Sequence, residues 1–313
     1  MIESTVVIGA GLAGLLFARQ RLTQGEKVLV LEKSRGLGGR MATKRFGDTL
    51  FDQGAQFFTA REPEFQAIVQ GWVEAGVAAR WPGTAHRFVG QPSMTGIAKH
   101  LATGLNVKRE AKITAVRRTG RGWEIEIDQQ SPVTCERLVM TAPAPQSLAL
   151  LAHGGVVLPG PLAESLARLT YHPCLALLVL LDGPSTIPVE GITPASGPLR
   201  WVADNGKKGV GSSATAAVTL QANAEFSRRH YQDEEAQVAE LLLPFARDWF
   251  GGAREVTVAL HRWKFSEPAA QYPNPCVWLP EFNLGFAGDA FGGPKIEGAA
   301  RSGLALARAV ATP

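Results

Sequence analysis

The sequence predicts an α/β fold in which a dinucleotide-binding domain on a parallel sheet is interrupted by an inserted α+β domain on an antiparallel sheet. Three observations support this prediction. The chain opens with a strand, a glycine-rich turn and a helix in residues 4–22. A second glycine turn, in residues 284–289, lies close to the other end of the chain. Between these ends, separated apolar segments have the composition of antiparallel strands.

The N-terminal segment is typical of a Rossmann-like domain. Residues 4–8 form a β-rich apolar run that fits a buried parallel strand, and the apolar spacing of residues 12–22 indicates a helix packed on it. Residues 27–31 predict the second strand. Glu32 at its end lies 21 residues after Gly11, where a carboxylate can accept both ribose hydroxyls of an adenosine. An ordinary glycine-rich turn, the alternative, would not predict this acid.

The residues of the turn have separate roles. Gly9 permits the tight turn, Gly11 lets the backbone approach a pyrophosphate, and Gly14 lets the helix lie close to the strand. The backbone amides of Leu12 and Ala13 begin the helix and face the phosphates. We therefore expect a phosphate-binding turn here.

The residues after Glu32 favour a flavin over an exchangeable nicotinamide cofactor. Residues 34–41 supply glycines for a second close approach of the backbone to a ligand, and Arg40 is suited to a bidentate phosphate contact. A simple nicotinamide dehydrogenase rarely needs such a segment. On residue types alone, a flexible basic loop is the alternative.

The composition excludes several classes of protein. Of 313 residues, 45% are hydrophobic and 19% charged, and the formal charge of +4 is spread along the chain without a basic and aromatic stripe, so we expect no nucleic-acid partner. No segment reaches the ~18 consecutive apolar residues of a membrane span, and residues 6–17 lack the basic flank of a signal peptide. Cys135, Cys174 and Cys276 have neither disulfide nor metal-ligand spacing. We expect a cytoplasmic protein without a metal site.

Longer motifs resemble those of the flavoprotein amine-oxidase superfamily. Its E-K-x-x-x-x-G-G-R pattern is matched by Glu32, Lys33, Gly38, Gly39 and Arg40. Residues 51–61, FDQGAQFFTAR, resemble the D-x-G-A-Q-Y-F-T-x-R segment of the renalases, a smaller branch, with Phe57 in place of Tyr. Residues 261–266 resemble H-R-W-x-Y-S, and residues 201–205 resemble W-x-A-R-N except at Asp204. Residues 284–289 and 296–299 resemble the closing flavin motif.

The resemblance implies an FAD-binding domain of the p-hydroxybenzoate-hydroxylase and amine-oxidase type. The expected cofactor-binding residues are Gly9, Gly11, Leu12, Ala13, Gly14, Glu32, Lys33, Gly39, Arg40, Met41, Gly54, Ala55, Gln56, Phe57, Ile113, Thr141, Ala142, Gly288, Asp289, Ile296, Glu297, Gly298 and Ala299. A helix that begins near Ile296 would stabilise negative charge on the reduced ring. A Gly-Asp turn that caps a surface helix is the alternative. The FAD is expected to be non-covalent, because Cys276 lies in YPNPCV rather than in S-G-G-C-Y.

If both ends of the chain build one cofactor site, the FAD-binding domain is discontinuous. We expect it to comprise residues 1–59, 91–150 and 268–313, and the substrate domain to comprise residues 60–90 and 151–267. Further strands are predicted at residues 113–116, 123–127, 135–141, 174–181, 214–221 and 255–263. A helix of about five turns is predicted at residues 233–250 and a linker at residues 154–161.

Renalases are associated with oxidising the 2- and 6-dihydro isomers of NAD(P)H to NAD(P)+, with transfer of electrons from the flavin to O2 and formation of hydrogen peroxide. The resemblance implies this activity, with hydride moving to flavin N5 and no catalytic base assigned. The substrate-pocket candidates are Gln56, Phe58, Trp201, Asn205, His261 and Trp263, each of which has core packing or structural hydrogen bonding as its alternative. A broader flavin amine oxidase or desaturase, and an FAD-bound module without enzymatic activity, remain open. The preferred dihydro isomer, the NAD or NADP form of the substrate and the oligomeric state also remain open.

Overall fold

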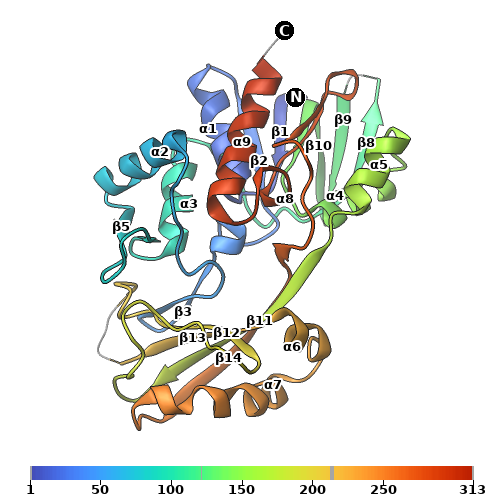
Figure 1. Ribbon diagram of the computed structural model, residues 1–313. Coiled ribbons are helices and arrows are strands. Elements are labelled where there is room, and N and C mark those ends of the chain that lie inside the picture. Colours follow the sequence, from blue (N-terminus) through green and yellow to red (C-terminus); the bar gives the residue numbers. More distant parts are fainter. Residues whose placement is uncertain (1, 121, 212–214, 312–313) are drawn as a thin grey trace. The chain divides into compact units, whose positions relative to one another are not determined.

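The computed structural model describes residues 2–120, 122–211 and 215–311 (Figure 1). The chain divides into two compact units. Unit 1 consists of Met1–Gly39, Ala98–Thr170 and Pro268–Pro313, and unit 2 of Arg40–Ile97 and Tyr171–Glu267. The predicted α/β architecture is confirmed, because unit 1 contains a largely parallel sheet and unit 2 interrupts it in sequence with an antiparallel one.

Unit 1 is built on an eight-stranded sheet. Its strands are β1 (Ile2–Ile8), β2 (Val28–Leu31), β7 (Asn106–Lys108), β8 (Ile113–Thr119), β9 (Gly122–Ile127), β10 (Gln130–Met140), β15 (Val277–Leu279) and β16 (Leu284–Phe286). The order is β15-β16-β10-β1-β2-β7, and β9 pairs with β10 and β8. Val7 of β1 lies between Val30 and Val139 in parallel register, and all three are fully buried. Burial on both faces explains the continuous apolar run of this strand.

The helices of unit 1 are α1 (Leu12–Thr23), α4 (Ala144–His153), α5 (Gly160–Ala167), α8 (Asp289–Gly292) and α9 (Lys295–Ala311), and α3 (Met94–Ala102) crosses the division between the units. Helix α9 lies beside α1 (Figure 1). A Cβ on Gly303 would be 2.9 Å from the carbonyl carbon of Ala13, so only glycine permits this close approach. In the described part of the chain, no helix is long and apolar enough to span a bilayer.

Unit 2 contains a four-stranded sheet of order β12-β13-β11-β14 and two hairpins, β3-β4 and β5-β6. The strands are β3 (Thr43–Phe46), β4 (Thr49–Asp52), β5 (Ala78–Arg80), β6 (Phe88–Gly90), β11 (Tyr171–Leu181), β12 (Leu199–Asp204), β13 (Ala217–Ala222) and β14 (Glu255–Pro268); the helices are α2 (Pro63–Glu74), α6 (Ala224–Arg229) and α7 (Glu235–Leu242). Alternate residues Leu175, Leu177 and Val179 of β11 pack in one core with Val238 and Leu242 of α7. This period of two is what a sheet with a helix on one face requires.

The prediction of one helix over residues 233–250 is wrong. Helix α7 ends at Leu242 and is followed by two short 3-10 turns, Leu243–Phe245 and Arg247–Phe250. Pro244 has no N–H to continue the α-helical ladder. The predicted linker is also shorter than expected, since α5 begins at Gly160. The predicted strand start at residue 214 lies outside the described residues, and β13 begins at Ala217.

The units divide the chain differently from the expected domains. Residues 40–59 and 91–97 belong to unit 2, and residues 151–170 belong to unit 1. Residues 40–59 belong to unit 2 because the end of β4 is hydrogen-bonded to β13. Thr219 Oγ1 donates to the carbonyl oxygen of Asp52 at 3.2 Å. Such a contact between positions far apart in the chain leaves no local pattern in the sequence.

Candidate functional site

The turn between β1 and α1 in unit 1 has the shape of a phosphate cradle. Gly9 has φ +108°, and a Cβ there would lie 2.7 Å from Thr141 Oγ1. A Cβ on Gly14 would collide with the Gly9 carbonyl oxygen and lie 3.1 Å from Val7 Cγ1. At Gly11, in contrast, no atom of the described chain beyond its immediate neighbours lies within 4 Å of the Cβ position. This open space faces the first turn of α1, whose leading N–H groups have no intrahelical acceptors, so an anion can bind there.

The segment after Glu32 returns to this turn. Gly38 N donates to the carbonyl oxygen of Ala10 at 2.9 Å, and Gly38 forms an isolated parallel bridge with Gly11. Gly38 and Gly39 have φ of +98° and +53°, which glycine adopts without strain. These conformations let the segment lie against the glycine turn.

Glu32 is held beside the cradle by backbone donors. Its Oε2 accepts Ala10 N–H at 2.9 Å, its Oε1 accepts Ser34 N–H at 2.8 Å, and the residue is 6% exposed. Each carboxylate oxygen keeps a further lone pair, so the group can still accept two ribose hydroxyls. Ala111 N donates to the Glu32 carbonyl at 2.9 Å, which brings the start of β8 at Ile113 close to this acid.

The C-terminal motif folds onto the same sheet. Ala287 N donates to the carbonyl oxygen of Met140 at 3.1 Å, and Gly288 N donates to Ser302 Oγ at 2.8 Å. Thr141, the next residue after β10, donates through Oγ1 to the Gly9 carbonyl at 3.1 Å. The two ends of the chain therefore meet within unit 1. The open cradle at Gly11 and the oriented Glu32 carboxylate together fit the adenosine diphosphate half of a dinucleotide.

In unit 2, residues 52–57 form a loop, here called the 52–57 loop. Side chains of the same unit hold this loop by donating hydrogen bonds to its carbonyl oxygens. The donors are Thr219 Oγ1 to Asp52 (3.2 Å), Trp263 Nε1 to Gln53 (2.8 Å), Gln221 Nε2 to Gly54 (2.6 Å) and Lys208 Nζ to Gln56 (3.3 Å). Ala55 N donates to the Arg40 carbonyl at 2.9 Å, and a Cβ on Gly54 would collide with that carbonyl. The loop thus has one tightly specified conformation.

The same loop has spare donors. The backbone N–H groups of Gly54, Gln56 and Phe57 have no acceptor among the residues that the structure describes. Because backbone N–H groups are strong donors, a loop with three that have no protein acceptor suits a ligand with carbonyl or ring-nitrogen acceptors. This donor set fits the ring of a flavin, which carries both.

Two of the predicted pocket residues use their side chains to hold this loop. The amide of Gln56 donates to the carbonyls of Asp52 and Gly54 and accepts from Lys208 Nζ at 3.0 Å. Asn205 is fully buried; it accepts Asp52 N–H at 3.1 Å and donates to the Ala217 carbonyl at 2.7 Å. The Gln56 and Asn205 amides therefore support the loop.

Phe58 and Trp201 are buried in aromatic clusters. Phe58 is 4% exposed and stacks on Phe88 with centroids 5.7 Å apart. Trp201 packs against Phe57 and Trp81, at 5.4 and 6.0 Å between centroids. Core packing accounts for Phe58, and Trp201 packs against Phe57 of the loop.

His261 and Trp263 are only partly buried and lie together on β14. Their rings form an edge contact with centroids 4.3 Å apart, and Trp263 anchors Gln53. Burial lowers the pKa of His261 below 6.5, and the positive charge of Lys44 lowers it further. His261 is therefore biased toward the neutral imidazole.

Arg40 lies in unit 2, where its Nη1 donates to the Ser266 carbonyl at 3.3 Å and its guanidinium lies 5.8 Å from the Tyr171 ring centroid. Sequence reasoning missed three other charged residues of unit 2, namely Asp52, Arg87 and Lys208. The only signals were the Asp of the D-x-G-A-Q match and the paired lysines after Asn205-Gly206.

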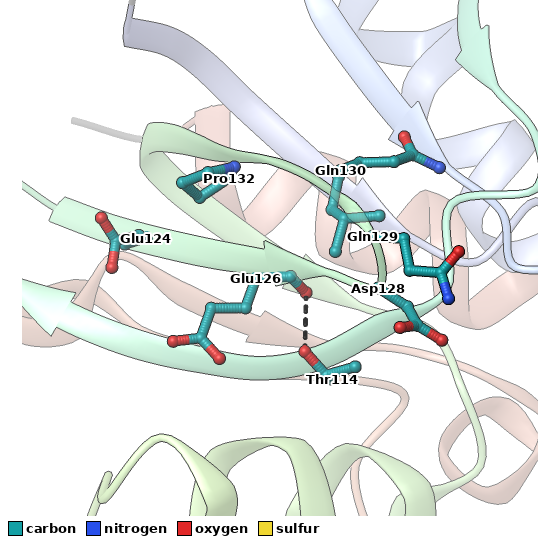
Figure 2. Close-up of a pocket in the computed structure, with 8 residues that line it drawn as sticks. Thr114, Glu124, Glu126, Asp128, Gln129, Gln130 and Pro132 are labelled. Carbon is teal, nitrogen blue, oxygen red and sulfur yellow. Dashed lines mark hydrogen bonds between the residues drawn. The ribbon is translucent and has the colours of Figure 1, made fainter.

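A separate pocket lies on the antiparallel β8–β9–β10 part of unit 1 (Figure 2). It is lined by Thr114, Glu124, Glu126, Ile127, Asp128, Gln129, Gln130 and Pro132, none of which is an expected cofactor residue. Two of its carboxylates are paired with cations: Glu126 with Arg117 at 2.8 Å and Asp128 with Lys112 at 3.0 Å. Thr114 Oγ1 donates to the Glu126 carbonyl across it.

Comparison with known proteins gives a family and several relatives. A family model described as flavin containing amine oxidoreductase matches residues 71–311, and one described as NAD(P)-binding Rossmann-like domain matches residues 7–72. Renalase of Mus musculus is 23% identical over 292 residues, which cover 85% of each chain. A putative flavin-containing monoamine oxidase AofH of Mycobacterium tuberculosis is 33% identical over 106 residues, or 29% of this chain and 23% of that protein.

Solved structures share the fold. A putative protoporphyrinogen oxidase from Exiguobacterium sp. 255-15 has a TM-score of 0.78 at 12% identity, with 98% of both chains covered. A putrescine oxidase bound to putrescine has a TM-score of 0.74 at 12% identity over 99% of both chains. An oxidoreductase from Methanosarcina mazei has a TM-score of 0.70 at 13% identity, covering 97% of this chain and 100% of that one.

Proposed function

The chain belongs to the flavin containing amine oxidoreductases, and from this we propose that it is an FAD-dependent oxidase that takes hydride from a dihydropyridine, with the 2- or 6-dihydro isomers of NAD(P)H as substrates. FAD is the cofactor of this oxidoreductase. When bound, FAD would supply a hydride acceptor at its N5 atom and a route for two electrons, with two protons, to O2, which gives hydrogen peroxide. The residues of the chain bind and orient the cofactor and the substrate.

The 52–57 loop is the observation that carries this proposal. Its Asp52, Gly54, Ala55 and Gln56 match the renalase segment, and the match to renalase covers 85% of each chain. The unpaired N–H groups of the loop are suited to the acceptors of the flavin ring. We infer that, within unit 2, the loop aligns a flavin ring. Within unit 1, we infer that Glu32 and the Gly11 cradle bind the adenosine diphosphate of a non-covalent FAD.

An amine substrate is less well supported. A cationic substrate needs an aromatic cage or a free carboxylate. The aromatic cluster next to the loop already contains a cation: Arg87 Cζ lies 4.4 Å from the ring centroid of Phe57, 5.4 Å from that of Trp81 and 5.5 Å from that of Trp201. A dihydropyridine needs neither, and it becomes aromatic by losing hydride alone, so no side chain has to remove a proton.

In the test, FAD-loaded protein is mixed under anaerobic conditions with the 2-dihydro or the 6-dihydro isomer of NAD(P)H, and the flavin absorbance is followed. Bleaching by either isomer, with peroxide on admission of air, is the expected result. Ordinary 4-dihydro NADH and putrescine are the comparison donors. Bleaching by amines but not by the isomers would overturn the proposal in favour of a broader amine oxidase or desaturase. No bleaching by any donor would indicate an FAD-bound binding module.

A further inference from the structure

We propose that Lys208 is a positioning residue of this site, whose buried ammonium group holds Gln56 and the 52–57 loop in the conformation that contacts the flavin ring. The inference rests on the proposed function, in which this loop lies against the ring. Lys208 would act through the loop and would not itself touch the cofactor.

Lys208 bridges the two ends of the loop. Its Nζ lies 3.2 Å from Asp52 Oδ2, 3.0 Å from Gln56 Oε1 and 3.3 Å from the Gln56 carbonyl oxygen. These three acceptors match the three donors of an ammonium group. Lys208 and Asp52 are both fully buried, so every one of these bonds lies out of water.

Asp52 is equally well satisfied. Its Oδ1 accepts Thr43 Oγ1–H at 2.8 Å and Met94 N–H at 3.0 Å, which leaves Oδ2 for Lys208. The carboxylate therefore joins β3, the start of α3 and Lys208 at the point where the loop begins. Burial lowers the pKa of Lys208, while the facing Asp52 carboxylate opposes that shift.

The turn after β12 directs Lys208 into this position. Gly206 N donates to Asp204 Oδ1 at 3.0 Å, and Lys208 N donates to the Asn205 carbonyl at 3.1 Å. Consecutive lysines then have different partners. Lys207 Nζ donates to the carbonyls of Ser185 and Ile187, at 2.8 and 2.6 Å, whereas Lys208 Nζ donates to the loop.

Fold stability alone does not account for this arrangement. Replacing a buried ion pair with apolar residues of similar size is often neutral or stabilising, because removing two charges from water costs as much as their attraction returns. Lys208 supplies a hydrogen-bond donor to both oxygens of Gln56, which an apolar side chain cannot do. Without that donor, the Gln56 end of the loop keeps only the hydrogen bonds of the Gln56 amide to the Asp52 and Gly54 carbonyls, and the N–H groups of Gln56 and Phe57 are less firmly directed.

The test compares three variants of the FAD-loaded protein. K208M removes the ammonium group, K208M/D52N removes both charges so that no unpaired buried carboxylate destabilises the fold, and K207M is the matched control. The readouts are FAD affinity, the visible flavin spectrum and the flavin midpoint potential from photoreduction, which needs no substrate. We expect K208M/D52N to bind FAD roughly tenfold or more weakly, with an altered spectrum and potential. K207M should leave all three unchanged.

A wild-type spectrum, potential and FAD affinity in folded K208M/D52N would overturn the proposal. If neither Lys208 variant folds, Q56A decides instead, because it leaves the Lys208–Asp52 pair in place; an unchanged spectrum and potential in Q56A would equally overturn it. These readouts stay informative if the dihydro isomers fail to bleach the wild-type flavin. In that case the proposed substrate fails while the role of Lys208 is still measured.

Discussion

Glu32 Oε2 accepts the backbone N–H of Ala10 at 2.9 Å, across the space between the end of β2 and the glycine turn. With Ser34 N–H on Oε1, both oxygens must act as acceptors toward the protein. A carboxylate can do this and an amide cannot, because the NH2 group of a glutamine would face one of the two donors. The acid at this position is therefore fixed in direction before any ligand binds.

Glu32→Gln should weaken FAD binding by about 10- to 100-fold, the equivalent of one or two lost hydrogen bonds to a charged group. Isothermal titration of the apoprotein with FAD measures this. Glu136→Gln, an exposed change on β10 of the same unit, is the control and should bind normally. Equal affinity of the two variants would show that Glu32 does not contact the cofactor.

Alanine at three glycines should separate folding from cofactor binding. Gly14→Ala places a Cβ against the Gly9 carbonyl and should destabilise the apoprotein by about 1–3 kcal/mol. Gly11→Ala meets open space, so apoprotein stability should change by under about 0.5 kcal/mol while FAD affinity falls roughly tenfold. Gly36→Ala, also in open space, should affect neither. Urea unfolding and FAD titration give both quantities, and tight FAD binding by Gly11→Ala would contradict the cradle.

Asn205→Ala should reveal a structural role. The change leaves the buried N–H of Asp52 without an acceptor and removes the side-chain donor to the Ala217 carbonyl and to Thr219 Oγ1, at an expected cost of about 2–4 kcal/mol in the free energy of unfolding. The Ala217 carbonyl still accepts the backbone N–H of residue 205. Asn223→Ala removes the N-cap of α6 and an exposed hydrogen bond to the Gly197 carbonyl, and should cost about 1 kcal/mol. A stable Asn205→Ala protein with a raised KM for the dihydro isomers would instead make Asn205 a substrate contact.

His261 should make stability depend on pH. Burial and Lys44 lower its pKa in the folded protein below the 6.5 of the unfolded chain. Between the lowered pKa and 6.5 the unfolded chain binds more protons, so stability should rise with pH through this window and be lowest below it. His261→Gln should remove this slope. Lys44→Met should raise the pKa toward 6.5, as followed by NMR of the ring protons. A His261 pKa at or above 6.5 in the native protein would contradict this account.

The three cysteines should be unreactive in the native protein. Burial raises the pKa of Cys135 to about 12 and that of Cys174 to about 11, and it also raises the pKa of Cys276. Few thiolates are present at neutral pH, so a thiol reagent should modify the folded protein slowly and the denatured protein rapidly.

The flavin should leave the chain on denaturation. Flavin that stays with denatured protein would show a covalent bond.

Local patterns in the sequence determined the cradle and the fold class. Strand, Gly9, Gly11, Gly14, helix and Glu32 lie within one βαβ unit, so the spacing of residue types alone specifies their geometry. The same holds for β11, whose apolar residues are sufficient to predict a strand. The end of α7 was available from the sequence, because Pro244 lies inside the predicted helix and cannot continue its hydrogen-bond ladder. The boundaries of the two units were not, because contacts to β13 decided them.

Only the tertiary structure decided which side chains support the 52–57 loop. Lys208 and Asp52 are 156 positions apart in the chain, and Asn205 and Asp52 are 153 apart. The sequence around a lysine or an asparagine does not indicate its hydrogen-bond partner, because that partner depends on which strands the topology brings together. The buried charge of Lys208 became interpretable only when the fold placed an acceptor at each of its donors.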